Sequence, residues 1–396
     1  MIKKVFPILG LAIFSSMLGN GIVSPLLPLY AESLGATGVG VGIIFAGFSI
    51  ANAISTPIFG RLSDRNGRKS FISVGLFIYA IISLGFIWAS SVYQLALMRF
   101  LHGAAGGMVL PIAQAYIGDV CPRGEEGKWM GYASAAFFTG FGLGPLMGGV
   151  LTEHLGMNVA FIAMGSFNIL AFFIVVFLLP EAGRKEVTIA PTPSFRKAGG
   201  SSMVRGLFFT RLAFAFGRAA FMVFLPIFAT IWLGLSPAFV GVLLATNVLL
   251  MSLLGIPSGK LADKFSRRSL VCLGSIINFA SLALIPLTHD FWQVMALSVL
   301  GSLGGAISLP AASALTIEEG RKFGMGSVIA LFNIAFSIGM AVGPILSGAI
   351  YDFADINLVF YFGAAMGFGG TGLFFWFTRR AWPAVEPVID EANHKK

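Results

Sequence analysis

Long apolar segments separated by short polar stretches are the dominant pattern along this chain of 396 residues. A membrane-spanning helix needs about 20 predominantly apolar residues, and twelve segments reach that length. They lie at approximately 5–30, 40–60, 71–90, 93–117, 129–152, 157–179, 206–233, 238–258, 269–286, 292–316, 324–350 and 357–378. We therefore predict an all-α membrane protein with twelve transmembrane helices.

A longer polar stretch after the sixth segment divides the predicted helices into two groups of six. We expect an N-terminal bundle over 1–180, a cytoplasmic linker over 181–205, a C-terminal bundle over 206–380 and a cytoplasmic tail over 381–396. The composition agrees, because 57% of the residues are hydrophobic and only 11% are charged, against about 25% charged in soluble domains. Little of the chain is left for a soluble domain.

Positive charges are unevenly distributed between the two sides of the predicted bundle. The termini and the loops on the same side hold 23 of the 26 Lys and Arg residues, and the opposite loops hold none. The remaining three, Arg99, Arg211 and Arg218, lie within predicted helices. Basic loops stay in the cytoplasm during insertion, so we predict a multi-pass protein of the inner (plasma) membrane with both termini in the cytoplasm. This distribution explains the net charge of +9 without nucleic-acid binding.

The chain also contains an internal repeat. "GRLSDRNGRK" at 60–69 has a near copy, "GKLADKFSRR", at 259–268, and "GLGP" at 142–145 has the counterpart "AVGP" at 341–344. Both pairs are 199 residues apart. Equal spacing over half the chain indicates two homologous six-helix halves. Parallel repeats with a substrate site between them are a transporter architecture, so we predict a transporter and not a membrane-embedded enzyme or sensor.

Three motifs resemble those of a known family. "GRLSDRNGRK" matches the loop 2–3 signature of the major facilitator superfamily apart from Ser63, and "LALMRFLHG" at 95–103 resembles its helix 4 signature, with Arg99 in the Arg position. Helix 5 is similar to the antiporter signature of the twelve-helix drug:proton antiporter family at every position: Gly131, Gly140, Gly144, Pro145, Gly148 and Gly149. The resemblance implies the major facilitator fold and a secondary transporter that exports small hydrophobic drugs or metabolites in exchange for protons by alternating access. It also implies a role in multidrug resistance.

The charged loop has two interpretations. Family resemblance implies a gating loop that latches the two halves together in one state, formed by Gly60, Asp64, Arg65, Gly67, Arg68 and Lys69, with Asp263 in the second copy. The alternative is a topology anchor only. Gly60 and Gly67 allow a tight connection and close helix approach, and the repeated placement of the aspartate favours the latch.

Helix 5 has a glycine face and a proline. Gly140, Gly144 and Gly148 share one face, which permits close helix packing, and Pro145 bends the helix. Generic packing explains this pattern, whereas the resemblance implies that the bent helix seals the cavity against leak.

Polar residues within the spans are the candidates for a substrate cavity, because a cation at membrane depth must face a cavity or a partner. The candidates are Asn20, Arg99, His102, Gln114, Tyr116 and Arg218. The alternative for Arg99 and Arg218 is a structural tether to backbone carbonyls. Arg211, two turns nearer the cytoplasm than Arg218, either joins the cavity or reaches the lipid headgroups.

The carboxylates depart from the pattern of many proton-coupled exporters, because no Asp or Glu lies in the middle of a predicted span. Such a cavity disfavours organic cations and accepts neutral or anionic molecules, so organic-anion uptake or facilitated exchange is the alternative function. The proton carrier is His102, whose unperturbed pKa lies near neutrality, or a carboxylate near a helix end such as Glu32, Asp119 or Glu153, or coupling is absent. The alternative for His102 is a structural role, as a hydrogen-bonded histidine packed among neighbouring helices.

Other chemistry is not indicated. Four His and two Cys residues form no metal-binding pattern, and no phosphate- or dinucleotide-binding motif has the required context. We expect no cofactor and no metal, with the proton gradient as energy source, and the lipid bilayer, a small molecule and the proton as partners of a monomer.

Overall fold

The structure, a computed structural model, describes residues 2–122, 124–181 and 195–379. Over these residues it is helical without strands, and twelve helical segments are long and apolar enough to cross a membrane. The predicted all-α transmembrane fold is therefore confirmed. The first half comprises α1 (Ile2–Ser33), α2 (Gly38–Asn66), α3 (Arg68–Trp88), α4 (Val92–Val120), α5 (Glu126–Leu155) and α6 (Met157–Leu178).

The second half begins with a six-residue helix, α7 (Phe195–Gly200). Its seventh span runs from Ser202 to Trp232 and combines α8 (Ser202–Ala219), α9 (Leu225–Ile227) and two wider π-helical turns at Ala220–Phe224 and Phe228–Trp232. The remaining helices are α10 (Pro237–Lys264), α11 (Arg267–Leu284), α12 (Phe291–Phe323), α13 (Met325–Phe353) and α14 (Ile356–Thr378). The predicted tail at 381–396 and residues 182–194 of the predicted linker lie outside the described residues, so the domain boundaries stay a prediction.

Local sequence signals set several helix ends. The Asp290 carboxylate accepts a hydrogen bond from the Gln293 N–H at 2.9 Å and so caps the start of α12. Gly67, Gly156 and Gly324 have φ values of 96°, 90° and 101° and each joins two successive helices in a single-residue turn. Only glycine adopts this backbone conformation without strain.

The helices extend beyond several predicted spans. The predicted span 238–258 becomes α10, which continues to Lys264, and the predicted span 292–316 becomes α12, which continues to Phe323. Both extensions carry charged residues, which a search for apolar segments does not count as part of a span.

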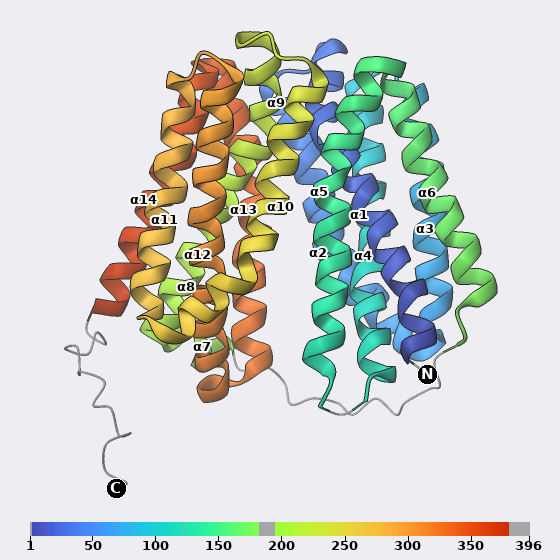
Figure 1. The fold of residues 1–396 in the computed structure, drawn as a ribbon, viewed down its shortest axis with the longest axis horizontal. Coiled ribbons are helices and arrows are strands. Elements are labelled where there is room, and N and C mark those ends of the chain that lie inside the picture. The colour runs from blue at the N-terminus through green and yellow to red at the C-terminus, as the bar shows by residue number, and fades with distance from the viewer. Residues whose placement is uncertain (1, 123, 182–194, 380–396) are drawn as a thin grey trace, which may run out of the picture.

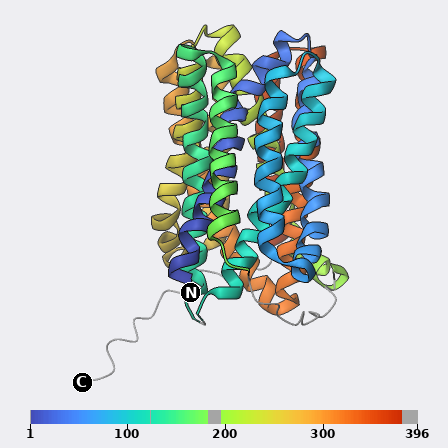
Figure 2. The ribbon, with the colours of Figure 1, turned by 90° about the vertical axis from the view of Figure 1, so that its right-hand side faces the viewer.

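The bundle has two chemically different ends, which we call the basic end and the acidic end. The basic end holds the α2–α3, α4–α5, α10–α11 and α12–α13 connections, and the described Lys and Arg residues outside the cavity gather there. The acidic end carries Glu32, Glu153, Asp290, Asp352 and Asp355. Figure 2 shows the helices running lengthwise between these ends, with the start of α1 at the basic end. Figure 1 shows the end of α14 at the same end, as an even number of spans requires.

The two halves lie side by side, as Figure 1 shows by the blue-to-green and yellow-to-red ribbons. Four helices join them, because α2 packs on α13 and α5 packs on α10. Within the first half α5 packs on α1, and within the second half α13 packs on α8. Each of α5 and α13 is thus held between a helix of its own half and a helix of the other half.

Candidate functional site

A cavity of about 490 Å³ lies between the two halves. Helices α1, α2, α3, α4 and α5 line it from one side, and the seventh span, α10, α12 and α13 line it from the other. Its wall is mostly apolar and contains seven phenylalanines: Phe45, Phe48, Phe137, Phe138, Phe141, Phe214 and Phe336. This size and lining are typical of a small-molecule site.

Three arginines supply the charge of the cavity wall. They are Arg99 of α4 and Arg211 and Arg218 of α8. Within the described parts of the chain, no Asp or Glu lines the same cavity. Arg211 therefore lies at the cavity, the first of its two predicted placements. The wall attracts negative charge and repels organic cations.

Arg99 is held in place by residues of its own half. Its Nη1 donates hydrogen bonds to Oδ1 of Asn20 and to Nδ1 of His102, both at 3.0 Å. The guanidinium also lies 4.2 Å from the ring centre of Phe48, a favourable cation–π geometry. Arg99 is thus a positive charge that Asn20 and His102 hold at the cavity wall.

His102 lies behind Arg99 and is fully buried, outside the cavity lining. Phe48, Tyr79 and Phe86 surround its ring with edge contacts. Because an arginine N–H can only donate, Nδ1 of His102 must accept the hydrogen bond from Arg99. His102 is therefore neutral here, with its proton on Nε2. A second proton on Nδ1 would break the bond to Arg99.

The two arginines of α8 are held differently. Arg211 lies 4.3 Å from the ring centre of Phe336 and 4.8 Å from that of Phe332. Arg218 lies 5.8 Å from the ring centre of Phe141. In the described residues neither guanidinium has a hydrogen-bond or ion-pair partner, and Arg211 is held by two phenylalanine rings whereas Arg218 is held by one.

Two predicted cavity residues lie elsewhere. The Tyr116 hydroxyl donates to the carbonyl of Pro180 at 2.6 Å, and neither Tyr116 nor the half-buried Gln114 lines the cavity. Tyr116 is about 25 Å from Arg99 along the helix axis, at 1.5 Å per residue. Both residues lie towards the basic end, beyond the cavity.

Several cavity residues were not predicted from the sequence. Ser49 and Asn52 of α2 line the cavity, and the Asn52 amide donates to the carbonyl of Gly103 on α4 at 3.2 Å. A lone Asn within an apolar span is a recognisable signal, since such a residue needs a partner in the bundle interior.

The glycines of the α5 motif pack in two directions. A Cβ added at Gly140, Gly144 or Gly148 would lie within 3.0 Å of the backbone of α1, and one added at Gly149 would lie within 3.0 Å of the backbone of α10 in the other half. Gly131 has nothing within 4 Å. The motif therefore fixes α5 against its own half and against the opposite half at the same time.

The halves meet closely at the acidic end. A Cβ added at Gly42 of α2 would collide with the carbonyl of Pro344 on α13, and one added at Gly241 of α10 would collide with the carbonyl of Pro145 on α5. Each glycine is 199 residues from its counterpart, as is each proline. The internal repeat therefore produces two equivalent backbone contacts that close the cavity at this end.

Two carboxylates reinforce the closure. Asp352, at the end of α13, accepts hydrogen bonds from the N–H groups of Gly38 and Val39 at 2.5 and 2.8 Å. Glu153, at the end of α5, accepts one from the N–H of Ala238 at 3.0 Å. Each carboxylate thus caps the first turn of a helix in the opposite half, where the helix dipole favours negative charge. Glu153 and Asp352 are also 199 residues apart.

Among the described residues, the ion pairs of the predicted gating loop lie within the first half. Arg68 pairs with Asp64 at 2.9 Å and with Asp119 of α4 at 2.5 Å. Gly67 forms the turn between α2 and α3, as expected, whereas Gly60 lies inside α2 with open space beside it and makes no close approach. Of the other loop residues, Arg65 is exposed and Lys69 is half-buried.

The second copy repeats this arrangement. Arg267 pairs with Asp263 at 3.2 Å and with Glu318 of α12. In the described part of the protein, the hydrogen bonds found between the two halves all lie at the acidic end. The halves are therefore joined at the acidic end, while the charged loops at the basic end stay within their own halves.

Twelve transmembrane helices in two repeated halves, with a cavity between them, define a membrane transporter. The family model of the Major Facilitator Superfamily matches residues 9–206 and again residues 207–394. The chain belongs to this superfamily. The predictions of the superfamily, of its fold and of a transporter rather than an enzyme are confirmed.

Curated relatives match almost the whole chain. The "Uncharacterized MFS-type transporter MJ1560" of Methanocaldococcus jannaschii is 29% identical over 371 residues, which cover 91% of this chain and 95% of that protein. The "Quinolone resistance protein NorA" of Staphylococcus aureus is 28% identical over 362 residues, which cover 89% of this chain and 91% of that protein.

Solved structures share the fold. A bacterial homologue of the human lysosomal transporter Spinster, in an inward-facing and unoccupied conformation, superposes with a TM-score of 0.84 at 16% identity, covering 97% of this chain and 99% of its own. The human organic anion transporter MFSD10 superposes with a TM-score of 0.66 at 18% identity, covering 94% of this chain and 99% of its own. At these identities the likeness concerns the fold alone.

Proposed function

We propose that this protein is a secondary transporter of the plasma membrane that exports small, mainly apolar molecules from the cytoplasm in exchange for protons. The observation that carries the proposal is the cavity of about 490 Å³ between the halves, walled by phenylalanines and closed at the acidic end. The similarity to NorA, a quinolone resistance protein, and the antiporter motif of α5 support export. Membership of the drug:proton antiporter family remains part of this proposal.

The basic end is the cytoplasmic end in this proposal, because basic loops remain in the cytoplasm. The closed acidic end then supports a conformation whose cavity is reached from the cytoplasm. Alternating access follows if the halves rock about the cavity, so that contacts at the acidic end open while contacts at the basic end form. A substrate entering from the cytoplasm is released on the outer side.

Proton coupling is assigned to His102 and Arg99. A guanidinium stays protonated at working pH, so Arg99 is not the carrier, whereas His102 can take a proton on Nδ1 only if Arg99 leaves its present position. A proton on His102 would thus break its hydrogen bond with Arg99 and leave the guanidinium held by Asn20, free to turn toward the cavity. The proton and the substrate would in this way act on the same guanidinium.

The variant His102→Gln tests this assignment. A Gln side chain can still accept a hydrogen bond from Arg99 but cannot titrate, so we expect proteoliposomes to retain downhill movement of a hydrophobic dye and to lose uphill movement on an imposed pH gradient. Arg99→Ala is the matched comparison, and we expect it to lose both while thermal unfolding in detergent stays near that of the wild type. Uphill transport by His102→Gln would show that another group, such as Asp119, carries the proton.

A second candidate function is exchange or uptake of organic anions, favoured by three cavity arginines without a lining carboxylate. Proteoliposomes separate the candidates. Dye accumulation driven by a pH gradient supports export, whereas exchange of labelled organic anions without dependence on the pH gradient supports the second candidate. Chemical conversion of the solute without movement across the bilayer would contradict both.

A further inference from the structure

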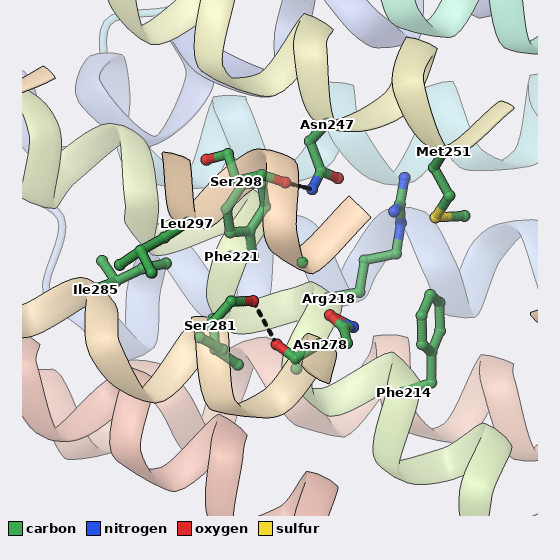
Figure 3. A pocket seen from close by; sticks show the side chains of 13 residues that line it. Phe214, Arg218, Phe221, Asn247, Met251, Asn278, Ser281, Ile285, Leu297 and Ser298 are labelled. Carbon is green, nitrogen blue, oxygen red and sulfur yellow. Dashed lines mark hydrogen bonds between the residues drawn. The ribbon is translucent and has the colours of Figure 1, made fainter. Parts of the chain in front are cut away.

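A small side pocket opens beside the main cavity within the second half (Figure 3). It has a volume of about 40 Å³ and is enclosed by the seventh span, α10, α11 and α12. Phe214, Arg218 and Met251 line both the main cavity and the pocket. The two spaces therefore meet at Arg218.

The pocket is polar for a site inside a membrane helix bundle. Asn247 and Asn278 contribute amides, and Ser281 and Ser298 contribute hydroxyls, together with the guanidinium of Arg218. In Figure 3 the Arg218 side chain extends toward α10, with Asn278 of α11 beneath it. Polar groups at this depth are costly and mark functional sites.

Three of these polar groups have no hydrogen-bond partner among the described residues. The Ser298 hydroxyl has no hydrogen-bond partner although the residue is only 1% exposed. In the described parts of the chain, the side-chain amide of Asn278 and the guanidinium of Arg218 also have no hydrogen-bond partner. By contrast, the Asn247 amide nitrogen already donates to the carbonyl of Ser298 at 3.4 Å and to the hydroxyl of Ser302 at 3.0 Å. Unsatisfied buried polar groups cost free energy unless a ligand or water binds them.

We propose that this side pocket binds the carboxylate group of an amphipathic organic acid, whose apolar part lies among the phenylalanines of the main cavity. Arg218 supplies the charge, and the Asn278 amide and Ser298 hydroxyl donate hydrogen bonds. The proposal rests on the proposed transport function and names the class of substrate. Arg218 is a substrate-binding residue in this proposal.

The chemistry of the pocket selects a carboxylate over other groups. A cation would face Arg218 directly, and a neutral amide would forgo the charge-assisted hydrogen bonds that guanidinium groups make with carboxylates. A single water needs about 10–15 Å³ of such space, so a pocket of about 40 Å³ accommodates a planar group of three heavy atoms.

Matched acid and amide probes test the proposal. Wild-type protein purified in detergent at pH 7.5 is dialysed to equilibrium against phenylacetate, 4-phenylbutyrate and 1-naphthylacetate, and against the neutral amide of each. We expect at least one acid to bind about 10- to 100-fold more tightly than its amide, as charge-assisted hydrogen bonds allow. If no acid of the panel binds more tightly than its amide, the proposal is wrong.

Variants locate the effect in the pocket. Arg218→Gln should lower the acid-to-amide ratio to about 2 or less, and Asn278→Ala and Ser298→Ala should each lower it about 3- to 10-fold, the loss of one hydrogen bond to a charged group. Amide affinity should stay unchanged in all three, which also reports that the cavity is folded. Arg218→Lys should restore part of the ratio.

Two controls share the chemistry but lie outside the pocket. Arg211→Gln removes a cavity arginine, and Ser337→Ala removes a cavity hydroxyl. We expect both to change the ratio less than threefold. Equal losses in Arg211→Gln and Arg218→Gln would assign the preference to the general positive field of the cavity and overturn the proposal.

The proposed function fails in a different way. In proteoliposomes, absence of movement of both the acid and the amide, together with the expected binding ratios in detergent, would contradict transport and leave the pocket as a binding site. Transport of the amide by Arg218→Gln without loss, together with unchanged binding of the acid, would contradict the pocket and leave transport intact.

Discussion

The two ends of the interface between the halves are built from the same four helices but are held in opposite ways. At the acidic end, Gly42, Gly149, Gly241 and Gly348 bring the backbones of α2, α13, α5 and α10 together. Toward the basic end the glycines of the same helices have open space beside them: Gly60, Gly131, Gly255, Gly259 and Gly326. At the acidic end the helices make backbone contacts between the two halves. At the basic end their charged residues instead form ion pairs within each half.

Each of the four interface helices carries a carboxylate in its last turn. Asp352 of α13 and Glu153 of α5 cap the first turns of their partners α2 and α10. At the basic end, Asp64 of α2 and Asp263 of α10 pair with arginines instead. Because α2 ends where α13 begins, we expect Asp64 to lie over the start of α13 when the basic end closes.

We propose that the two conformations of the transport cycle exchange one kind of contact, a carboxylate that caps a helix of the opposite half. Opening the acidic end would lose two such contacts, and closing the basic end would gain two. This exchange would keep the two states within a few kcal/mol of each other, as alternating access requires. Changes at the two ends should therefore shift the equilibrium in opposite directions.

The largest effect is expected at the glycine contacts. Gly42→Val places side-chain atoms against the carbonyl of Pro344, and overpacking of this kind costs about 1–3 kcal/mol. We expect transport to fall at least tenfold and the acidic end to open. A cysteine at Ser24, in a chain with Cys121 and Cys272 replaced by Ser, reports opening through labelling by an impermeant maleimide from outside.

Gly131→Ala is the control, because Gly131 also lies on an interface helix, α5, but a Cβ added there contacts nothing within 4 Å. It should leave both labelling and transport unchanged. Unaltered labelling in Gly42→Val would contradict the role of the close backbone contact in closing the acidic end.

The second prediction concerns the charged loop. Asp64→Asn should severely reduce transport and decrease labelling at position 24, because the state with a closed basic end loses its cap on α13. The pair with Arg68 joins neighbouring turns of one half, and Arg68 keeps its second partner, Asp119, in the variant, so folding and affinity for a probe substrate should change little. Asp263→Asn should act in the same direction more weakly, since its loop has diverged and carries Phe265 in place of Asn66.

Loss of substrate affinity in Asp64→Asn, with normal labelling at position 24, would contradict the latch. The loop would then serve as a topology anchor, the alternative that the distribution of basic residues also explains.

Much of the fold could be predicted from the sequence, because span length and the 199-residue repeat are local or periodic signals. The charged ends of α10 and α12 were missed, since helical residues outside the bilayer need not be apolar. Asn20, Arg99 and Arg218 line the cavity. His102, three residues from Arg99, lies behind it because α4 also packs on α2 and α3.

The side pocket and the carboxylate caps could not be predicted. Asn247, Asn278 and Ser298 lie on three different helices and meet only after the second half has folded. Glu153 and Asp352 are visible in the sequence as an acidic pair at equal spacing, but their partners are backbone N–H groups of the other half. Every residue except proline has a backbone N–H, so the sequence does not show which of these groups a carboxylate will bind.

The smallest effect, and the sharpest test of the comparison, is expected at the acidic carboxylates. In Asp352→Asn one amide oxygen replaces a charged group that accepts from two N–H groups, so the closed acidic end should lose stability and labelling at position 24 should rise about two- to fivefold. Glu153→Gln should change labelling in the same direction. The double variant Asp64→Asn/Asp352→Asn removes one contact from each state, and we expect its labelling to return toward the wild-type value. Labelling that instead falls as far as in Asp64→Asn alone would show that the two ends are not exchanging equivalent contacts, and that closure of the acidic end depends on the glycine packing alone.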